Sequence, residues 1–194
     1  MVWDALAKEN LTASVQMVGS VTSNPSNCKI ASGFDNHHEG HSGWKGTDIA
    51  NDYIEKWAKD TPADIVNFML GTNDVSAKRP PRSTQDIVDA FTKIVTTMRT
   101  QVPTASFIVD KLILLPNNSA PVDALNKAIP LWAEAVNKPT SRVVVADCSS
   151  QAGYTAAMLS DGIHPNTQGD QFISQAISAA LIPLVKEKLA SKAK

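Results

Sequence analysis

An aspartate and a histidine near the C-terminal end of the sequence have the spacing of an acid–base pair. Asp161 precedes His164 by three residues in a loop that Pro165 stiffens. A carboxylate at this distance can hold one imidazole nitrogen and leave the other free to accept a proton. The pair is therefore a candidate general base with its orienting group, although a helix-initiating turn with an incidental histidine has the same spacing.

A second polar turn, Gly71-Thr72-Asn73-Asp74, follows directly after an apolar run. Its glycine permits a sharp turn. The amide of Asn73 is a neutral donor that could stabilise a developing oxyanion, and Asp74 could contact a polar substrate. A simple turn with capping Asn and Asp side chains is the alternative interpretation.

The elements that must position these turns alternate between helical and strand periods. Helical spacing of apolar residues covers 2–10, 47–59, 83–101, 122–136 and the region from 167 onward. Short apolar runs predict strands at 14–18, 64–70, 105–115 and 142–146. Thr47 and Ser83 are the predicted N-caps, and Pro130 is expected to interrupt its helix.

This alternation predicts an α/β protein with a doubly wound parallel sheet in a three-layer α/β/α sandwich. Ligands bind outside the carboxyl ends of the strands in such sheets, and both polar turns follow strands. The length of 194 residues predicts a single domain, 1–194. A net charge of −1 without a basic run argues against nucleic acid as a partner, and no apolar stretch is long enough to span a membrane.

Taken together and in this order, the two turns resemble the third and fifth sequence blocks of the SGNH (GDSL-type) hydrolase family. The long loop 34–44, which ends in Gly43-Trp44, resembles the second block of its acetylxylan-esterase-like carbohydrate esterases. The resemblance covers essentially the whole chain and implies a flavodoxin-like fold. It also implies that His164 is the base, that Asp161 orients it, and that Asn73 and Gly43 donate to the oxyanion.

The chain departs from this family at its start. Family members begin with an apolar strand ending in Gly-Asp-Ser, whose serine attacks the ester carbonyl, and no Gly-Asp-Ser occurs here. Ser20, Ser42 and Ser76 follow predicted strands, but none lies on a strand-to-helix elbow. In the family's strand order 2-1-3-4-5, the absent strand lies between 14–18 and 64–70. We therefore expect one of three situations: the neighbouring strands close the gap, another segment or a second copy in a homodimer fills it, or the sequence is a truncated form of a longer protein.

The loop 34–44 concentrates three of the four histidines. His37, His38 and His41 lie beside Glu39, so a metal site is one interpretation, although the spacing is not that of a zinc-binding His-Glu-x-x-His helix. A loop that contacts a polar substrate through Glu39, His41 and Trp44 is the second, and a solvated loop the third. Trp44 could stack on a sugar ring or anchor the loop.

The two cysteines also leave alternatives open. Cys28 and Cys148 are either two thiols or one disulfide. The resemblance favours a secreted location, although the chain shows no export signal.

The resemblance implies a carbohydrate esterase that removes O-acetyl groups from a polysaccharide such as xylan, or from a small ester, without a cofactor or metal. Because the nucleophilic serine is absent, we expect little activity from the chain as written. Two alternatives are a non-catalytic carbohydrate-binding pseudoenzyme and a metal-dependent hydrolase built on His37, His38 and His41.

Overall fold

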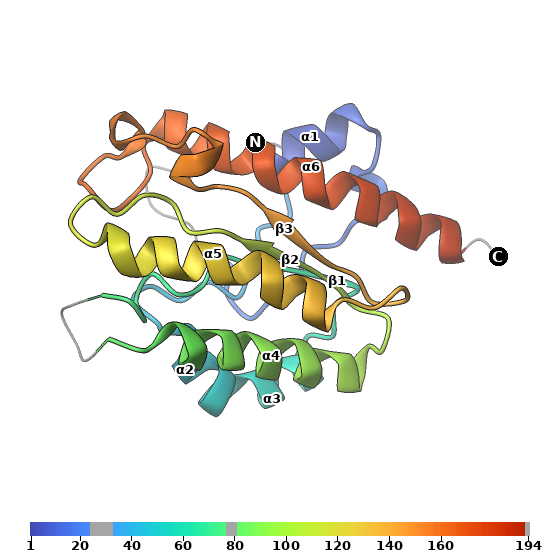
Figure 1. The fold of residues 1–194 in the computed structure, drawn as a ribbon. Helices are drawn as coiled ribbons and strands as arrows, with labels where there is room; N and C mark the ends of the chain where they lie inside the picture. The colour runs from blue at the N-terminus through green and yellow to red at the C-terminus, as the bar shows by residue number, and fades with distance from the viewer. Residues whose placement is uncertain (24–32, 77–80, 193–194) are drawn as a thin grey trace.

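The structure is a computed structural model that describes residues 1–23, 33–76 and 81–192. Helices lie on both faces of a central parallel sheet, which gives three layers (Figure 1). In chain order the elements are α1 Val2–Lys8, a 3₁₀ turn Thr12–Ser14, α2 Gly46–Asp48, a π-helical turn Ile49–Tyr53, α3 Ile54–Asp60, β1 Ile65–Phe68, α4 Thr84–Gln101, β2 Ser106–Asp110, α5 Ser119–Val136, β3 Val143–Ala146, 3₁₀ turns Ser150–Ala152 and Ala156–Met158, and α6 Thr167–Lys192.

The three strands form one parallel sheet in the order β1-β2-β3. Phe68 lies opposite Val109, and Val109 opposite Val145. Every residue of β2 is buried, as expected for a central strand with helices on both faces. The predicted α/β sandwich with a parallel sheet is therefore confirmed.

Each face of the sheet has its own hydrophobic core. On one face α3, α4 and α5 cover the strands, and Phe91 of α4 packs edge-to-face against Phe68 and Trp132 at centroid distances of 5.2 and 5.5 Å. On the other face Ile108 and Leu184 of α6 are packed together. The apolar stripes of the helices thus hold the sheet in the middle layer.

Two helix starts test the predicted caps. Ser83 is the N-cap of α4 as expected: its hydroxyl accepts from the Asp86 N–H, and the Asp86 carboxylate accepts from the Ser83 N–H, both at 3.1 Å. The prediction for Thr47 was wrong, because the helix already begins at Gly46 and a carboxylate from another loop binds its first N–H groups. The prediction for Pro130 was also wrong, because α5 continues through this exposed residue to Val136.

The strand predicted at 14–18 was also wrong. Residues 12–14 form a 3₁₀ turn, and 15–19 run on without a strand partner in the described part of the chain. A strand needs a neighbour for its backbone groups, and within the described residues none lies beside the outer edge of β1. Val15 packs instead against a small buried cluster of Leu6, Leu11 and Val185, while Val18 is 40% exposed.

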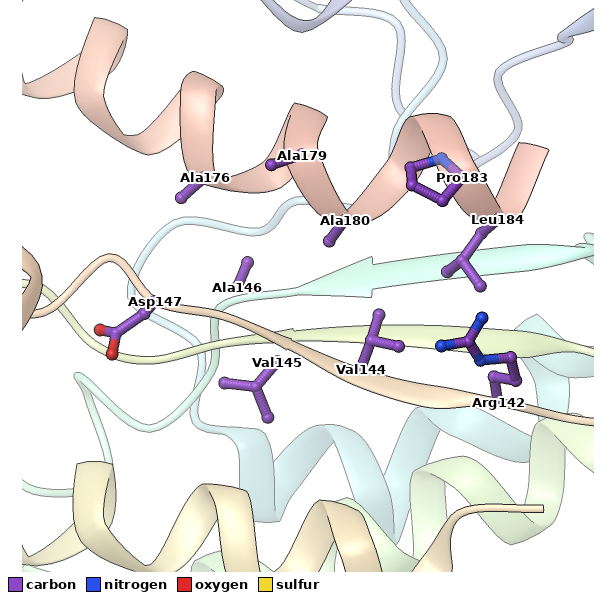
Figure 2. A pocket seen from close by; sticks show the side chains of 10 residues that line it. All are labelled: Arg142, Val144, Val145, Ala146, Asp147, Ala176, Ala179, Ala180, Pro183 and Leu184. Carbon is purple, nitrogen blue, oxygen red and sulfur yellow. The ribbon is translucent and has the colours of Figure 1, made fainter. Parts of the chain in front are cut away.

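A groove of about 410 Å³ lies between β3 and α6, beside their packed contact (Figure 2). Small apolar side chains line it, among them Ala146 on the strand and Ala176 and Ala180 on the helix. Arg142 and Asp147 stand at its ends, paired with Glu187 and Lys111 respectively. None of the residues that the sequence assigns to a site lines this groove.

Within the described residues, no helix is both long and apolar enough to cross a bilayer.

Candidate active site

Asp161 and His164 are hydrogen-bonded to each other. The Oδ2 atom of Asp161 lies 2.7 Å from Nδ1 of His164, while its Oδ1 atom accepts the backbone N–H groups of His164 at 2.8 Å and Ile163 at 3.0 Å. These hydrogen bonds, the backbone one from His164 first, hold the pKa of Asp161 well below its usual range. The side chain thus stays a carboxylate that fixes the imidazole through Nδ1. Within the described residues, Nε2 of His164 makes no hydrogen bond.

The loop that carries this pair is bonded at both ends. Ser160 donates its N–H to the His164 carbonyl at 2.8 Å, and Asn166 donates its N–H to the Met158 carbonyl at 2.9 Å. The side chain of Asn166 also accepts from Gly169 in the first turn of α6. The orientation of the pair is therefore set by α6 and by the preceding 3₁₀ turn.

Asn73 lies beside the turn that contains Gly43. Its Nδ2 atom donates to the Trp44 carbonyl at 2.9 Å, which leaves the second amide hydrogen for another acceptor. Gly43 has a φ of +79°, and nothing lies within 4 Å of the position a Cβ would take. The turn thus needs a glycine for its backbone conformation, and the space beside it is open.

Asp74, which we expected to contact substrate, is fully buried. Its two carboxylate oxygens accept the N–H of Gly46 at 2.7 Å, the N–H of Thr47 at 3.0 Å and the Thr47 hydroxyl at 2.8 Å. It binds the first turn of α2, where unsatisfied N–H groups and the helix dipole favour an anion. The carboxylate therefore joins the loop after β1 to the start of the helix.

The three neighbouring histidines have separate partners. His37 pairs with Asp35, His41 donates to Glu39, and His38 donates through Nε2 to the Ser23 carbonyl while its Nδ1 accepts the Gly40 N–H. In the described part of the chain, no three His, Cys, Asp or Glu side chains lie close enough to hold a metal ion. The arrangement differs from the one that a metal-dependent hydrolase built on this loop requires.

Trp44 belongs to an aromatic cluster. Its ring is 4.2 Å from His41, 4.4 Å from Tyr53 and 6.0 Å from Trp57, measured between centroids. It also packs against the core on the α4 face of the sheet. These contacts match the alternative in which Trp44 anchors the loop.

The sequence analysis missed a hydrogen-bonded polar pair, a buried Asp110 and an exposed Asn67. Asp110, 2% exposed at the end of β2, accepts a hydrogen bond from Asn67 at 2.9 Å. Burial raises the pKa of Asp110 to about 7, and burial together with Asp110 and Asp147 raises that of the Cys148 thiol to about 12. The signal was an Asn and an Asp within two otherwise apolar runs. Cys148 is a buried thiol, and Cys28 lies outside the described residues, so its pairing stays open.

The structure thus assembles two groups, Asn73 with the Gly43 turn and His164 with Asp161. No hydrogen bond or ring contact joins these groups within the described residues. Both lie in loops that pack at the same end of the sheet, because Met69 after β1 and Met158 before the His164 loop contact one cluster around Tyr154. This is the carboxyl end of the strands, where parallel sheets bind ligands.

The sequence and the fold were compared with those of known proteins. Residues 15–172 match the model of the GDSL-like lipase/acylhydrolase family. Two solved structures are each 44% identical with a TM-score of 0.92, and each alignment covers 96% of this chain and 89% of the other. One is an acetyl esterase serine-to-alanine mutant with an acetate ion, the other a carbohydrate esterase family 3 protein from Talaromyces cellulolyticus.

More distant structures share the fold. A family 3 carbohydrate esterase from Clostridium thermocellum is 22% identical over 96% of this chain and 85% of that one, with a TM-score of 0.73. A search of curated protein sequences found no match. The resemblance drawn from the sequence blocks is confirmed, and the chain belongs to the GDSL-like lipase/acylhydrolase family.

Proposed function

We propose that the chain has the acid–base and oxyanion-binding parts of an esterase that removes O-acetyl groups from carbohydrate, with acetylated xylan as the substrate class. The observation that carries this proposal is the hydrogen bond between Asp161 Oδ2 and His164 Nδ1. The 44% identity to an acetyl esterase and to a family 3 carbohydrate esterase supports the acyl group and the sugar. Because such a polysaccharide lies outside the cell, the proposal includes a secreted location.

The proposed chemistry assigns one step to each group. Asp161 keeps the proton of the neutral imidazole on Nδ1, so that Nε2 of His164 takes the proton of the attacking hydroxyl. Nε2 then gives this proton to the sugar oxygen as its bond to the acyl carbon breaks, and the sugar leaves with a free hydroxyl. The Gly43 N–H and the second Asn73 amide hydrogen donate to the carbonyl oxygen as it becomes an oxyanion. No cofactor takes part in these steps.

The nucleophile decides the rate. With no Gly-Asp-Ser in the sequence, water is the nucleophile that His164 would activate. In well-characterised serine hydrolases, the site without its triad retains about 10³–10⁴-fold acceleration over water. We therefore expect only such residual hydrolysis from this chain.

Hydrolysis of p-nitrophenyl acetate and acetylated xylo-oligosaccharides tests the proposal. We would compare the chain with a form extended at its N-terminus by an apolar strand ending in Gly-Asp-Ser, and with a matched form ending in Gly-Asp-Ala. The serine form should gain activity that His164→Ala abolishes, and the alanine form should not. A folded serine form without activity would reject the assigned roles. Ordinary esterase rates in the unextended chain would place a nucleophile within it.

The missing Gly-Asp-Ser also favours a second candidate, a carbohydrate-binding pseudoenzyme. Calorimetric titration with xylo-oligosaccharides distinguishes the two. Binding without turnover in the serine-extended form would support the pseudoenzyme.

A further inference from the structure

We infer that Glu39 and His41 are positioning residues that hold the Gly43 turn, rather than residues that contact substrate. The inference rests on the proposed function, in which the Gly43 N–H is an oxyanion donor.

The carboxylate of Glu39 is the fixed point of the arrangement. It accepts the Ser20 N–H at 2.8 Å, the Ser20 hydroxyl at 2.7 Å and the His41 Nε2–H at 2.8 Å. Burial opposes the ionisation of Glu39, but the hydrogen bonds from His41 and Ser20 outweigh it and leave its pKa below its usual range. With three donors bound, this carboxylate is already engaged and is poorly suited to bind a sugar hydroxyl.

Ser20 itself belongs to an anchored segment. One residue later, Val21 exchanges two backbone hydrogen bonds with His38, at 3.0 and 2.9 Å. The loop before Glu39 also packs on α1, where Phe34 meets Trp3 edge-to-face at 5.4 Å. Glu39 is therefore held by backbone pairing on one side and by Ser20 on the other.

The ring of His41 transmits this constraint to the turn. The imidazole lies nearly parallel to Trp44, at 20° and 4.2 Å between centroids, and to Trp57 of α3, at 11° and 5.1 Å. Its side chain is only 22% exposed. Because Nε2 is bonded to Glu39 and the ring contacts two tryptophans, His41 can adopt few other rotamers.

His41 and Trp44 bracket Gly43. The Trp44 N–H donates to the His41 carbonyl at 3.4 Å, and the Trp44 carbonyl accepts from Asn73. One chain of contacts thus runs from Ser20 through Glu39, His41 and Trp44 to Asn73. Both proposed oxyanion donors are attached to it, so their relative position is set before a ligand arrives.

Nuclear magnetic resonance on the chain as it exists tests the inference with two measurements. The order parameter of the Gly43 N–H reports whether the turn is rigid on the picosecond-to-nanosecond timescale. Titration with sodium acetate, whose carboxylate mimics the acyl oxyanion, reports whether Gly43 and the Asn73 amide bind an anion. We expect a rigid Gly43 and acetate-dependent shifts of both groups in the wild type.

Paired variants separate the hydrogen bond from the ring contact. His41→Phe keeps a ring against Trp44 and loses the donor, whereas His41→Gln keeps an N–H donor and loses the ring. Each should lower the Gly43 order parameter and weaken acetate binding several-fold, and Glu39→Gln should resemble His41→Phe. The matched control is His37→Phe, in the same loop but 49% exposed, which should change neither measurement.

The outcomes distinguish this inference from the proposed function. The inference would be overturned if the His41 variants kept the wild-type Gly43 order parameter. It would also be overturned if the wild type binds acetate and the His41 variants bind it equally well. Either result would leave the proposed function standing. A wild type that does not bind acetate, while its Gly43 is rigid and becomes mobile in the variants, would support the positioning role and reject the oxyanion site.

Discussion

Asp110 is a carboxyl group almost without solvent contact, and its described hydrogen bond comes from a neutral amide. Burial raises its pKa to about 7, and the bond from Asn67 opposes this only in part. The folded protein therefore keeps a proton on Asp110 at pH values where the unfolded chain has lost it. Asp110 should accordingly make its own contribution to the pH dependence of the protein's stability.

The direction follows from proton linkage. Because the folded-state pKa is raised, the contribution of Asp110 to the free energy of unfolding falls as pH rises from about 4 to about 7 and is constant above that, a total loss of about 4 kcal/mol. Asp110→Asn preserves the shape and removes the titration. Denaturant unfolding should show that the free energy of unfolding of the variant, relative to that of the wild type, is higher at pH 8 than at pH 4 by about 2–4 kcal/mol. An identical difference at both pH values would mean that Asp110 does not titrate in this range.

Two helix starts differ in where their cap comes from. The α4 cap is local and exposed, whereas the N–H groups at the start of α2 are bound by the buried carboxylate of Asp74. Removing Asp74 leaves two buried N–H groups without an acceptor, each costing about 1–3 kcal/mol. Removing an exposed cap costs about 1 kcal/mol.

We therefore expect Asp74→Ala to lower the free energy of unfolding by about 2–4 kcal/mol and Asp86→Ala by about 1 kcal/mol or less. Urea denaturation of both variants measures the difference. Equal losses would contradict the account of Asp74 as the acceptor for a buried helix start.

The first turn of α6 lies unusually close to the preceding loop. A Cβ added to Gly169 would lie 2.4 Å from the Met158 carbonyl oxygen and 2.5 Å from the Tyr154 hydroxyl. Gly169→Ala should therefore displace the loop that carries His164 and cost about 1–3 kcal/mol. Thermal unfolding and the chemical shifts of His164 check both effects, and Gln168→Ala, on the exposed side of the same turn, is the control.

At the scale of the whole molecule, β1 has one edge beside which the described residues place no further strand. Ser106 donates its N–H to the Asp64 carbonyl, so residues 64, 66 and 68 face β2 and the N–H groups of Ile65 and Asn67 point to the outer edge. Hydrogen exchange should be fast at Ile65 and Asn67 and slow at Val66 and Phe68. Equal protection would indicate that a further segment, or a second copy in a homodimer, pairs with β1.

The sequence was sufficient where the structure depends on local pattern. Continuous apolar runs identified the three parallel strands, and Ser83 with Asp86 identified the start of α4. The strand predicted at 14–18 failed because an apolar run becomes a strand only beside a partner.

In the candidate site, too, contacts between residues close in sequence could be predicted and contacts between distant residues could not. Asp161 and His164 are three residues apart, so their bond could be expected. The bond from Asp74 to Thr47 spans 27 residues, and the contact of His41 with Trp57 depends on how a loop folds against a helix. No local pattern encodes either contact.

Two consecutive side chains, Asn73 and Asp74, bind the same short segment, 44–47. Asn73 donates to the Trp44 carbonyl, and Asp74 accepts from the N–H groups of Gly46 and Thr47. The contacts therefore require a fixed number of residues between Trp44 and Thr47, and they require Asn73 and Asp74 to be adjacent. Surface loops usually absorb an inserted residue at little cost. Here an insertion on either side would separate donor from acceptor, so length variation in this protein should be accommodated away from residues 44–47 and 71–74.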